Sequence, residues 1–101
     1  MIAIDVLTKY QACILCSCLH RNINNNFISV SFKIDDDGEI ILKIVLKEKS
    51  SIEDEYIDDI TAEYEALQEA DILKEVQILV DKTAMPLENV VYQCFLEPNT
   101  H

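Results

Sequence analysis

Two stretches of the chain carry an apolar residue at every third or fourth position, the spacing that lines one face of a helix. The first runs from about residue 3 to residue 21, and its stripe consists of Ala3, Leu7, Tyr10, Ile14 and Cys18. Val6, Leu15 and Leu19 widen this stripe, so the predicted helix is apolar around most of its circumference. Such a helix either packs under a sheet or is partly covered by a partner. The asparagines that follow it end the helix, because Asn competes for backbone hydrogen bonds.

The second helical stretch extends from Ser50 to Asp71, and its apolar stripe consists of Ile52, Tyr56, Ile60, Tyr64 and Leu67. Ser50 is followed three residues later by Glu53, which is the pattern of a capping box. In that motif the two side chains each accept a hydrogen bond from the backbone of the other residue. The motif predicts that the second helix begins at Ser50.

Between the two helices, apolar and polar residues alternate in two stretches, which is typical of half-buried strands. The stretches are Phe27–Ile34 and Glu39–Lys47, and Asp36, Asp37 and Gly38 lie between them. A two-residue loop would set the apolar face of one strand against the polar face of the other. A three-residue loop with Gly38 in the left-handed conformation avoids this mismatch. We therefore expect a hairpin that pairs Ile34 with Ile40, Phe32 with Leu42 and Val30 with Ile44.

After the second helix, the pattern predicts two more strands, Lys74–Asp81 and Val90–Leu96, separated by a loop that contains Met85 and Pro86. The order of elements is then αββαββ. Helices on one face of a four-stranded sheet would bury both apolar stripes. A length of 101 residues suits one domain. We therefore expect a single α+β domain over residues 1–101, with two helices packed on a mainly antiparallel four-stranded sheet.

Negative charge is concentrated on the second predicted helix. The chain has a formal net charge of −11, and residues 50–71 contain nine carboxylates and neither Lys nor Arg. Like charges four residues apart on a helix each cost about 0.2–0.5 kcal/mol, and no lysine in this stretch relieves them. One explanation is that the charge keeps a small protein soluble. The other is that this face binds a basic protein, because such charge argues against nucleic acid or an anionic membrane as partner.

Eight carboxylates are the candidate partner-binding residues. Four of them project from the second helix in a row: Asp54, Asp58, Glu65 and Glu69. The others flank this row or lie at the predicted hairpin tip: Glu55, Asp59, Asp36 and Asp37. Such a row would steer a surface rich in Lys and Arg toward the helix and discriminate against acidic proteins. Tyr56 and Tyr64 are candidate anchors, but aromatic residues at helical spacing usually belong to the core, and we expect them there.

The first predicted helix carries residue types that zinc prefers, in Cys13, Cys16, Cys18 and His20. On a helix, Cys13 and Cys16 are neighbours, whereas Cys18 points to a different side. A redox pair of Cys13 and Cys16 would lack the strand that precedes a thioredoxin-type motif. We therefore expect reduced thiols in a cytoplasmic protein, and neither a metal site nor another cofactor.

Catalytic motifs are missing from the sequence. General acid or base catalysis needs a carboxylate or His in a pocket, whereas these carboxylates crowd one solvated helix face. The sequence has no glycine-rich phosphate loop, nucleophile elbow or HExxH motif. It has no run of 18 apolar residues that could span a membrane, and we interpret the uncharged stretch 10–20 as part of the mature chain. We expect a protein that is not an enzyme.

Three segments in the second half of the chain carry a resemblance to a known group of proteins. They are ITAEYEAL from Ile60, EVQILV from Glu75 and MPLENVVYQCFLEP from Met85. Together they resemble the C-terminal half of small acidic immunity proteins, which are encoded beside bacterial contact-dependent growth inhibition toxins. The resemblance covers less than half of the chain. It implies a cytoplasmic, non-enzymatic inhibitor that binds one cognate toxin domain, often a basic RNase or DNase, and blocks its active site.

Two other functions fit the same sequence features. An acidic cargo chaperone or adaptor for a basic protein would dimerise through the apolar first helix. A cysteine-dependent metal or redox protein would instead use Cys13 and Cys16. The three alternatives differ in the partner that should co-purify with the protein: a toxin, a second copy with its cargo, or a stoichiometric metal.

Overall fold

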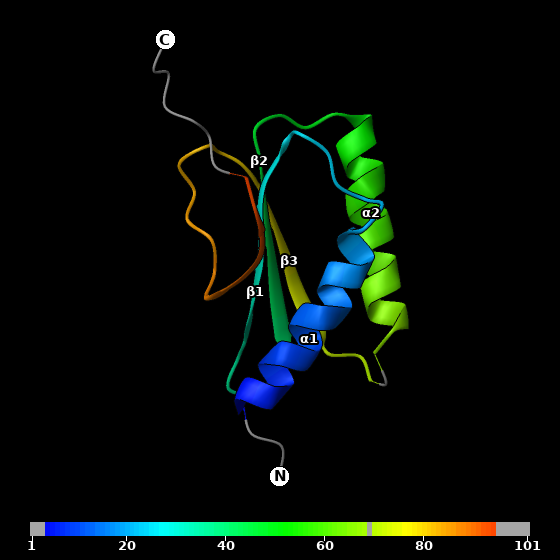
Figure 1. Cartoon of the computed structure of the whole chain (residues 1–101), viewed down its shortest axis with the longest axis vertical. Coiled ribbons are helices and arrows are strands. Elements are labelled where there is room, and N and C mark those ends of the chain that lie inside the picture. Colours follow the sequence, from blue (N-terminus) through cyan, green and yellow to red (C-terminus); the bar gives the residue numbers. More distant parts are fainter. Residues whose placement is uncertain (1–3, 69, 95–101) are drawn as a thin grey trace.

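The computed structural model describes residues 4–68 and 70–94 and has the predicted order αββαββ. Its elements are α1 (Ile4–Leu19), β1 (Phe27–Ile34), β2 (Ile40–Leu46), α2 (Ser51–Ala66), β3 (Leu73–Val80) and β4 (Asn89–Gln93) (Figure 1). Two predicted elements extend beyond the described residues. The predicted first helix does so at Ala3, and the predicted fourth strand at Phe95 and Leu96. The fold is α+β, with two helices and one four-stranded sheet.

The sheet is mixed, and its strand order is β3-β2-β1-β4. β1 runs antiparallel to both of its neighbours, whereas β3 runs parallel to β2. The expectation of a mainly antiparallel sheet therefore does not hold for the β2–β3 pair. The reason is the length of α2, which with 16 residues spans about 24 Å, close to the length of a seven-residue strand. The helix returns the chain to the end of the sheet where β2 begins, so β3 starts there as well.

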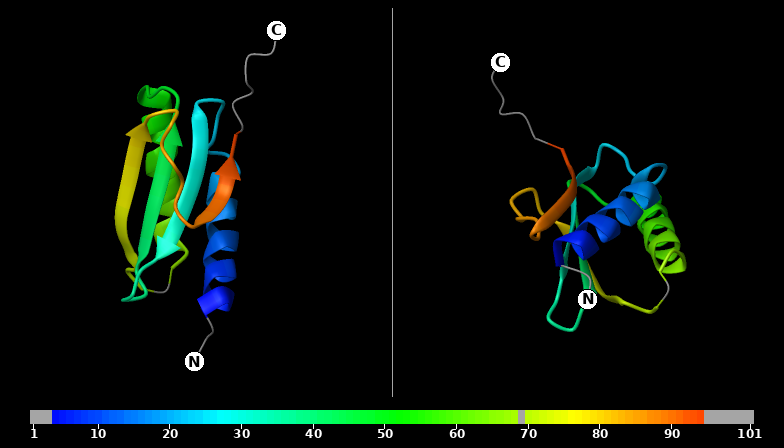
Figure 2. Two further views of the ribbon diagram at one scale, coloured as in Figure 1. Left: turned by 90° about the vertical axis from the view of Figure 1, so that its left-hand side faces the viewer. Right: turned by 60° about the horizontal axis from the view of Figure 1, so that its bottom comes forward.

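Both helices cover one face of the sheet, as Figure 2 shows. α1 lies behind β1 and β4, and α2 lies behind β2 and β3. The loop between β3 and β4 crosses the opposite face, where the Leu87 backbone N–H donates to Ser31 Oγ at 2.8 Å. The ammonium group of Lys43 donates to the Met85 carbonyl in the same region. The helices and this loop thus enclose the centre of the sheet and leave β3 at one margin.

The β1–β2 hairpin has the predicted register, with Ile34 opposite Ile40 and Phe32 opposite Leu42. Gly38 has a φ of 81°, the left-handed conformation that the three-residue loop requires. Asp35 holds this loop, because its Oδ1 accepts the backbone N–H groups of Asp37 and Glu39, each at 2.9 Å. The local prediction for the hairpin is confirmed in both register and loop type.

The buried face of α2 differs from the predicted stripe. Ile60 and Tyr64 are fully buried, as expected, but Ile52 is 54% exposed and Leu67 is 53% exposed. Their places in the buried stripe are taken by Glu53 and Ile57. The helix is therefore rotated about its axis relative to the prediction. The carboxylate of Glu53 explains the rotation, since it lies under the helix start and accepts hydrogen bonds there.

A similar difference occurs on α1, where Tyr10 was predicted in the apolar stripe but is 53% exposed. The adjacent Gln11 is 2% exposed and packs on the side of α2. Leu15, Cys18 and Leu19 complete the buried face of α1, as the sequence indicated. Among residues 4–68 and 70–94, neither helix is long and apolar enough to cross a membrane.

Candidate protein-binding surface

Five of the eight predicted partner-binding carboxylates lie exposed on α2: Asp54, Glu55, Asp58, Asp59 and Glu65. They are exposed because the buried stripe of Glu53, Ile57, Ile60 and Tyr64 occupies the opposite side of the helix. Glu69, which was predicted in the same row, lies outside the described residues. The predicted acidic face is thus present on the outside of the molecule over the length of α2.

The two flanks of α2 face different neighbours. On one flank, the ring of Tyr56 contacts the ring of Phe27 in β1, with 6.4 Å between the ring centroids. Glu63 is on the same flank and acts electrostatically on Cys18 of α1. At about 100° per residue, three carboxylates fall on the other flank, away from α1 and on the side of β3: Asp54, Asp58 and Glu65. We call these three residues the acidic flank.

Among the described residues, positive charges neutralise only a small part of the acidic flank. Two ion pairs join described residues, Lys49 Nζ to Asp54 Oδ1 at 3.2 Å and Lys74 Nζ to Asp35 Oδ2 at 2.9 Å. Only the first involves a carboxylate of α2, and both of its side chains are about half exposed. Lys33 and Lys43 alternate with core residues along β1 and β2 and so point to the face opposite the helices. Lys47 directly follows the end of β2. The charge of α2 is therefore available to another molecule.

The hairpin carboxylates Asp36 and Asp37 lie apart from the start of the acidic flank. Both are exposed at the β1–β2 tip, where β2 begins, whereas α2 begins beyond the other end of β2 (Figure 1). One oxygen from each of Asp35, Asp37 and Glu39 lies within 4.8 Å of the others. Asp35 is already occupied by Lys74 and by two backbone N–H groups. This group therefore stabilises the turn, and its link to β3 lowers the pKa of the Asp35 carboxyl.

β3 is an edge strand whose last residues are unusually exposed for their type. Ile78 is 41%, Leu79 is 37% and Val80 is 53% exposed. In the parallel register, Ile78 lies beside Ile44 and Val80 beside Leu46, both of which are fully buried. The apolar side chains continue the core face of β2 beyond the cover that α2 provides. Leu79 lies beside Val45 and so points to the opposite face of the sheet.

The start of α2 is held by Glu53, a carboxylate that is only 1% exposed. Its Oε1 accepts the backbone N–H of Ser50 at 2.7 Å and the Ser50 hydroxyl at 2.6 Å. Its Oε2 accepts the side-chain amides of Asn24 at 2.6 Å and Asn26 at 3.2 Å. The hydrogen bonds from Ser50, and then those from Asn24 and Asn26, lower the pKa of Glu53 from 4.5 to about 2. Glu53 thus joins the predicted capping box to the segment before β1.

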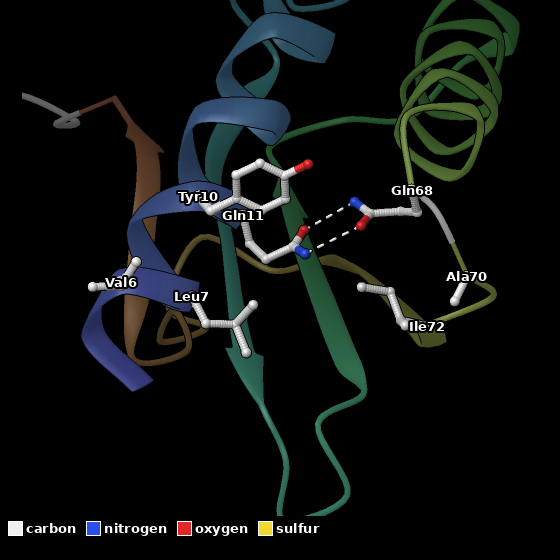
Figure 3. Close-up of a pocket in the computed structure, with 7 residues that line it drawn as sticks. All are labelled: Val6, Leu7, Tyr10, Gln11, Gln68, Ala70 and Ile72. Carbon is white, nitrogen blue, oxygen red and sulfur yellow. Dashed lines mark hydrogen bonds between the residues drawn. The ribbon is translucent and has the colours of Figure 1, made fainter. Parts of the chain in front are cut away.

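A cavity of about 370 Å³ opens between α1 and the end of α2 (Figure 3). Its polar wall is a pair of glutamines: Gln11 Nε2 donates to Gln68 Oε1 at 3.1 Å, and Gln68 Nε2 donates to Gln11 Oε1 at 2.9 Å. The hydroxyl of Tyr64 also donates to Gln11 Oε1, at 2.6 Å, and burial raises the pKa of this phenol. The amides satisfy one another, and the remaining lining is apolar: Val6, Leu7, Tyr10, Ala70 and Ile72. This lining has no titratable pair for acid–base chemistry.

A second cavity, of about 420 Å³, lies under the loop between β3 and β4. Ser29 and Cys94 contribute to its lining, together with Lys82 and Thr83 from the loop. The hydroxyl of Ser29 is buried and has no hydrogen-bond partner among the described residues. Neither Asp, Glu nor His is among the residues that line this cavity. Among the described residues, neither cavity therefore offers a carboxylate or an imidazole as a general base.

The cysteines of α1 do not converge on one point. Cys13 and Cys16 are exposed, Cys18 is 1% exposed in the core, and Cys94 is partly buried on β4's side of the sheet. Burial, and then the negative charge of Glu63, raise the pKa of the Cys18 thiol to about 11. Cys18 therefore cannot join Cys13 and Cys16 at one metal ion without leaving the core.

The thiols should differ strongly in reactivity. At pH 8, we expect iodoacetamide to alkylate Cys13 and Cys16 within minutes and Cys18 only after unfolding, because alkylation needs an accessible thiolate. Peptide mass spectrometry after timed labelling checks this, with a sample unfolded in urea as the control. Equal labelling rates for Cys16 and Cys18 in the folded protein would contradict the packing of α1.

The sequence analysis did not predict that Glu53 and Gln11 are buried, although both hold the helices in place beneath this surface. Each is polar, and each lies four residues before an apolar core residue, Ile57 and Leu15 respectively. Extending the apolar stripes by this spacing would have found both positions. Their polarity excluded them, since charged and amide side chains are rarely buried without hydrogen-bond partners.

No protein-family model matches the chain, and a comparison with curated proteins also finds no match.

Proposed function

We propose that this protein is an immunity protein, which binds a basic toxin domain through the acidic surface of α2 and neutralises it. The toxin domain is most simply a nuclease, because the catalytic grooves of nucleases are basic so that they can hold phosphates. Binding over such a groove would block access of the nucleic acid. The protein would act in the cytoplasm, as a binding protein without catalytic activity or a cofactor.

The observation that carries this proposal is the charge of the acidic flank, of which one ion pair, between half-exposed Lys49 and Asp54, compensates a part. Asp54 and Asp58 repel each other at four residues' separation, and among the described residues Lys49 alone pairs with an α2 carboxylate. A helix under selection for stability alone would carry lysines among these positions. The lysines of the chain lie instead largely on other faces. A cationic partner would relieve the repulsion on binding, so the same charges that destabilise the free helix favour the complex.

The alternative function, a dimeric cargo chaperone, has less support from the geometry. The dimer interface predicted for such a chaperone is the apolar first helix. In the structure, Leu15, Cys18 and Leu19 of α1 are instead buried in the core. The exposed apolar side chains of α1 that remain for a contact with a second copy are Val6, Tyr10, Cys13 and Cys16. These four side chains offer less than the roughly 800 Å² per partner that a stable interface buries.

Co-expression with the basic protein encoded next to this chain's gene tests the proposed function. We expect a one-to-one complex on size-exclusion chromatography, loss of the neighbour's nuclease activity in the complex, and protection of cells that express the neighbour. A chaperone would leave that activity intact after delivery. Failure of the two proteins to associate, or an active nuclease in the complex, would overturn the proposal.

A further inference from the structure

We infer that the partner adds an extended basic segment to the free edge of β3, as a fifth strand of the sheet. This inference rests on the proposed function, since it names the part of the basic partner that the surface would receive. It combines three features that lie side by side: an open backbone edge, apolar side chains on both faces of that edge, and the acidic flank of α2.

The backbone edge of β3 is open. Within residues 4–68 and 70–94, β3 is the last strand on its side of the sheet and pairs with β2 alone. Its other side therefore presents N–H and C=O groups without a strand partner among these residues. Natural edge strands are usually short or carry lysine, proline or a bulge that prevents pairing with another chain. β3 has eight residues and no proline. Its register with β2 is irregular near its start, where Ile40 lies opposite Leu73 and Ile41 opposite Glu75. The lysine at that point, Lys74, is bound to Asp35, and from Glu75 to Val80 the pairing with β2 is regular.

The opposite edge of the sheet provides a contrast. β4 has five residues, and its register with β1 shifts between Val30 and Ser31. α1 also covers β4 on the helix side (Figure 2). β4 is short, covered and irregular in its middle, whereas the irregularity of β3 lies near its start, so β4 is the poorer template for strand addition.

Side chains of β3 would contact an added strand on both faces of the sheet. Ile78 and Val80 point to the helix side, and Leu79 points to the other side, each at least 37% exposed. In strand addition, backbone hydrogen bonds supply affinity and contacts with alternate side chains supply specificity. The three residues lie in the second half of β3.

Charge determines which kind of segment would fit. α2 runs back along the sheet between β2 and β3, so its first turns, with Asp54 and Asp58, lie level with the end of β3, and Glu65 lies nearer the start. An added strand would present every second side chain to this acidic flank and the others to the Leu79 side. The segment that fits therefore alternates Lys or Arg with apolar residues.

A second copy of the chain is a poor occupant of the same edge. Each copy carries a net charge of −11, and pairing through β3 would bring two acidic flanks together. Like charges facing each other across an interface disfavour association. The charge thus favours a basic segment over self-association.

The test uses an alternating Lys-Val octapeptide with blocked ends as probe, and an alternating Glu-Val octapeptide as its control. Titration of the ¹⁵N-labelled protein should shift amide signals of residues 73–80 and of the acidic flank, and should slow hydrogen exchange of β3 amides. The Glu-Val peptide should leave these signals unchanged. Absence of binding by the Lys-Val peptide at millimolar concentration, or shifts confined to β4, would overturn the inference.

A matched pair of variants locates the binding. Ile78→Lys should weaken binding of the Lys-Val peptide at least about tenfold, because it places a like charge at the edge. Val90→Lys is the control, since Val90 is 42% exposed on the other edge strand and Ile78 is 41% exposed. Leu79→Lys replaces Ile78→Lys if the latter lowers the melting temperature. Equal effects of the two lysine substitutions would contradict strand addition at β3.

The same titration separates this inference from the proposed function. If Ile78→Lys abolishes binding while neutralising the acidic flank has no effect, strand addition stands and the acidic-surface function fails. If neutralising the flank abolishes binding while Ile78→Lys has no effect, the acidic surface stands and strand addition is overturned.

Discussion

Replacing Asp54, Asp58 and Glu65 by Asn, Asn and Gln is expected to slow association with the basic partner by about 10- to 100-fold at low ionic strength. The three carboxylates form the acidic flank. Among the described residues, their negative charge is balanced only by the ion pair between Asp54 and the half-exposed Lys49. Long-range attraction acts before contact, so the change should appear mainly in the association rate. The dissociation rate should change less, because it depends on the close contacts.

The stability of the triple variant should remain within about 0.5 kcal/mol of the parent protein. Neutralisation removes the repulsion between Asp54 and Asp58, which costs about 0.2–0.5 kcal/mol. It also removes the exposed ion pair of Asp54 with Lys49, which contributes about 0–1 kcal/mol. The two effects have opposite signs and similar sizes. A loss of binding can therefore be assigned to the surface and not to unfolding.

Stopped-flow association at about 0.01 M and about 0.5 M salt provides the measurement, since the lower concentration leaves charges unscreened over about 30 Å. The control changes the net charge equally at another place: Asp36→Asn, Asp37→Asn and Glu88→Gln. We expect this control to have a much smaller effect, and it also measures the contribution of the hairpin tip. If both triple variants slow association equally, total charge governs the encounter and α2 is not the binding element.

Replacing Glu53 by Ala should give the largest loss of stability of any single carboxylate on α2. Glu53 is 1% exposed and accepts four hydrogen bonds, from the Ser50 backbone, the Ser50 hydroxyl, Asn24 and Asn26. Removing the acceptor leaves several polar groups without a partner and breaks the link between α2 and the segment before β1. We expect the melting temperature to fall by roughly 5 °C or more.

Protonation of Glu53 should make the stability of the protein depend on pH. Its pKa is about 2 in the folded protein and lies near 4.5 when the hydrogen bonds are absent. A lowered pKa in the folded state means that the unfolded chain binds the proton more tightly. The contribution of Glu53 is therefore complete above about pH 4.5 and is lost as the pH falls toward 2. Glu53→Gln should remove this part of the acid sensitivity, although it lowers stability at neutral pH.

Melting temperatures measured by circular dichroism between pH 2 and pH 7 check this expectation. Glu55→Gln serves as the control, because Glu55 is exposed in the first turns of the same helix. The difference between the parent and Glu53→Gln should shrink below pH 4.5, whereas the Glu55→Gln curve should run parallel to the parent. Parallel curves for the parent and Glu53→Gln would contradict the proposed role of Glu53.

The hairpin and the capping box could be predicted because both depend on residues close together in the chain. The register of Ile34 with Ile40 follows from the alternation of apolar residues and from the position of Gly38. The start of α2 follows from Ser50 and Glu53. In each case, neighbouring residues determine the backbone hydrogen bonds. The exposed carboxylates of the acidic surface were predicted for the same reason, since charge and helical periodicity place them away from the core.

The tertiary structure alone decided the strand order, the rotation of both helices and the exposure of β3. Alternation in residues 73–80 indicates a strand but does not tell whether it pairs with β2 or with β4, or in which direction. Hydrophobic periodicity leaves a helix free to rotate by one residue, and the hydrogen bonds of Glu53 to Asn24 and of Gln11 to Gln68 set the rotation. These bonds join residues distant in the sequence. The sequence by itself therefore determined the elements and the acidic charge, because these depend on local contacts. The sequence did not determine that the free edge of β3 lies beside this charge. That arrangement depends on contacts between elements, which only the folded chain makes.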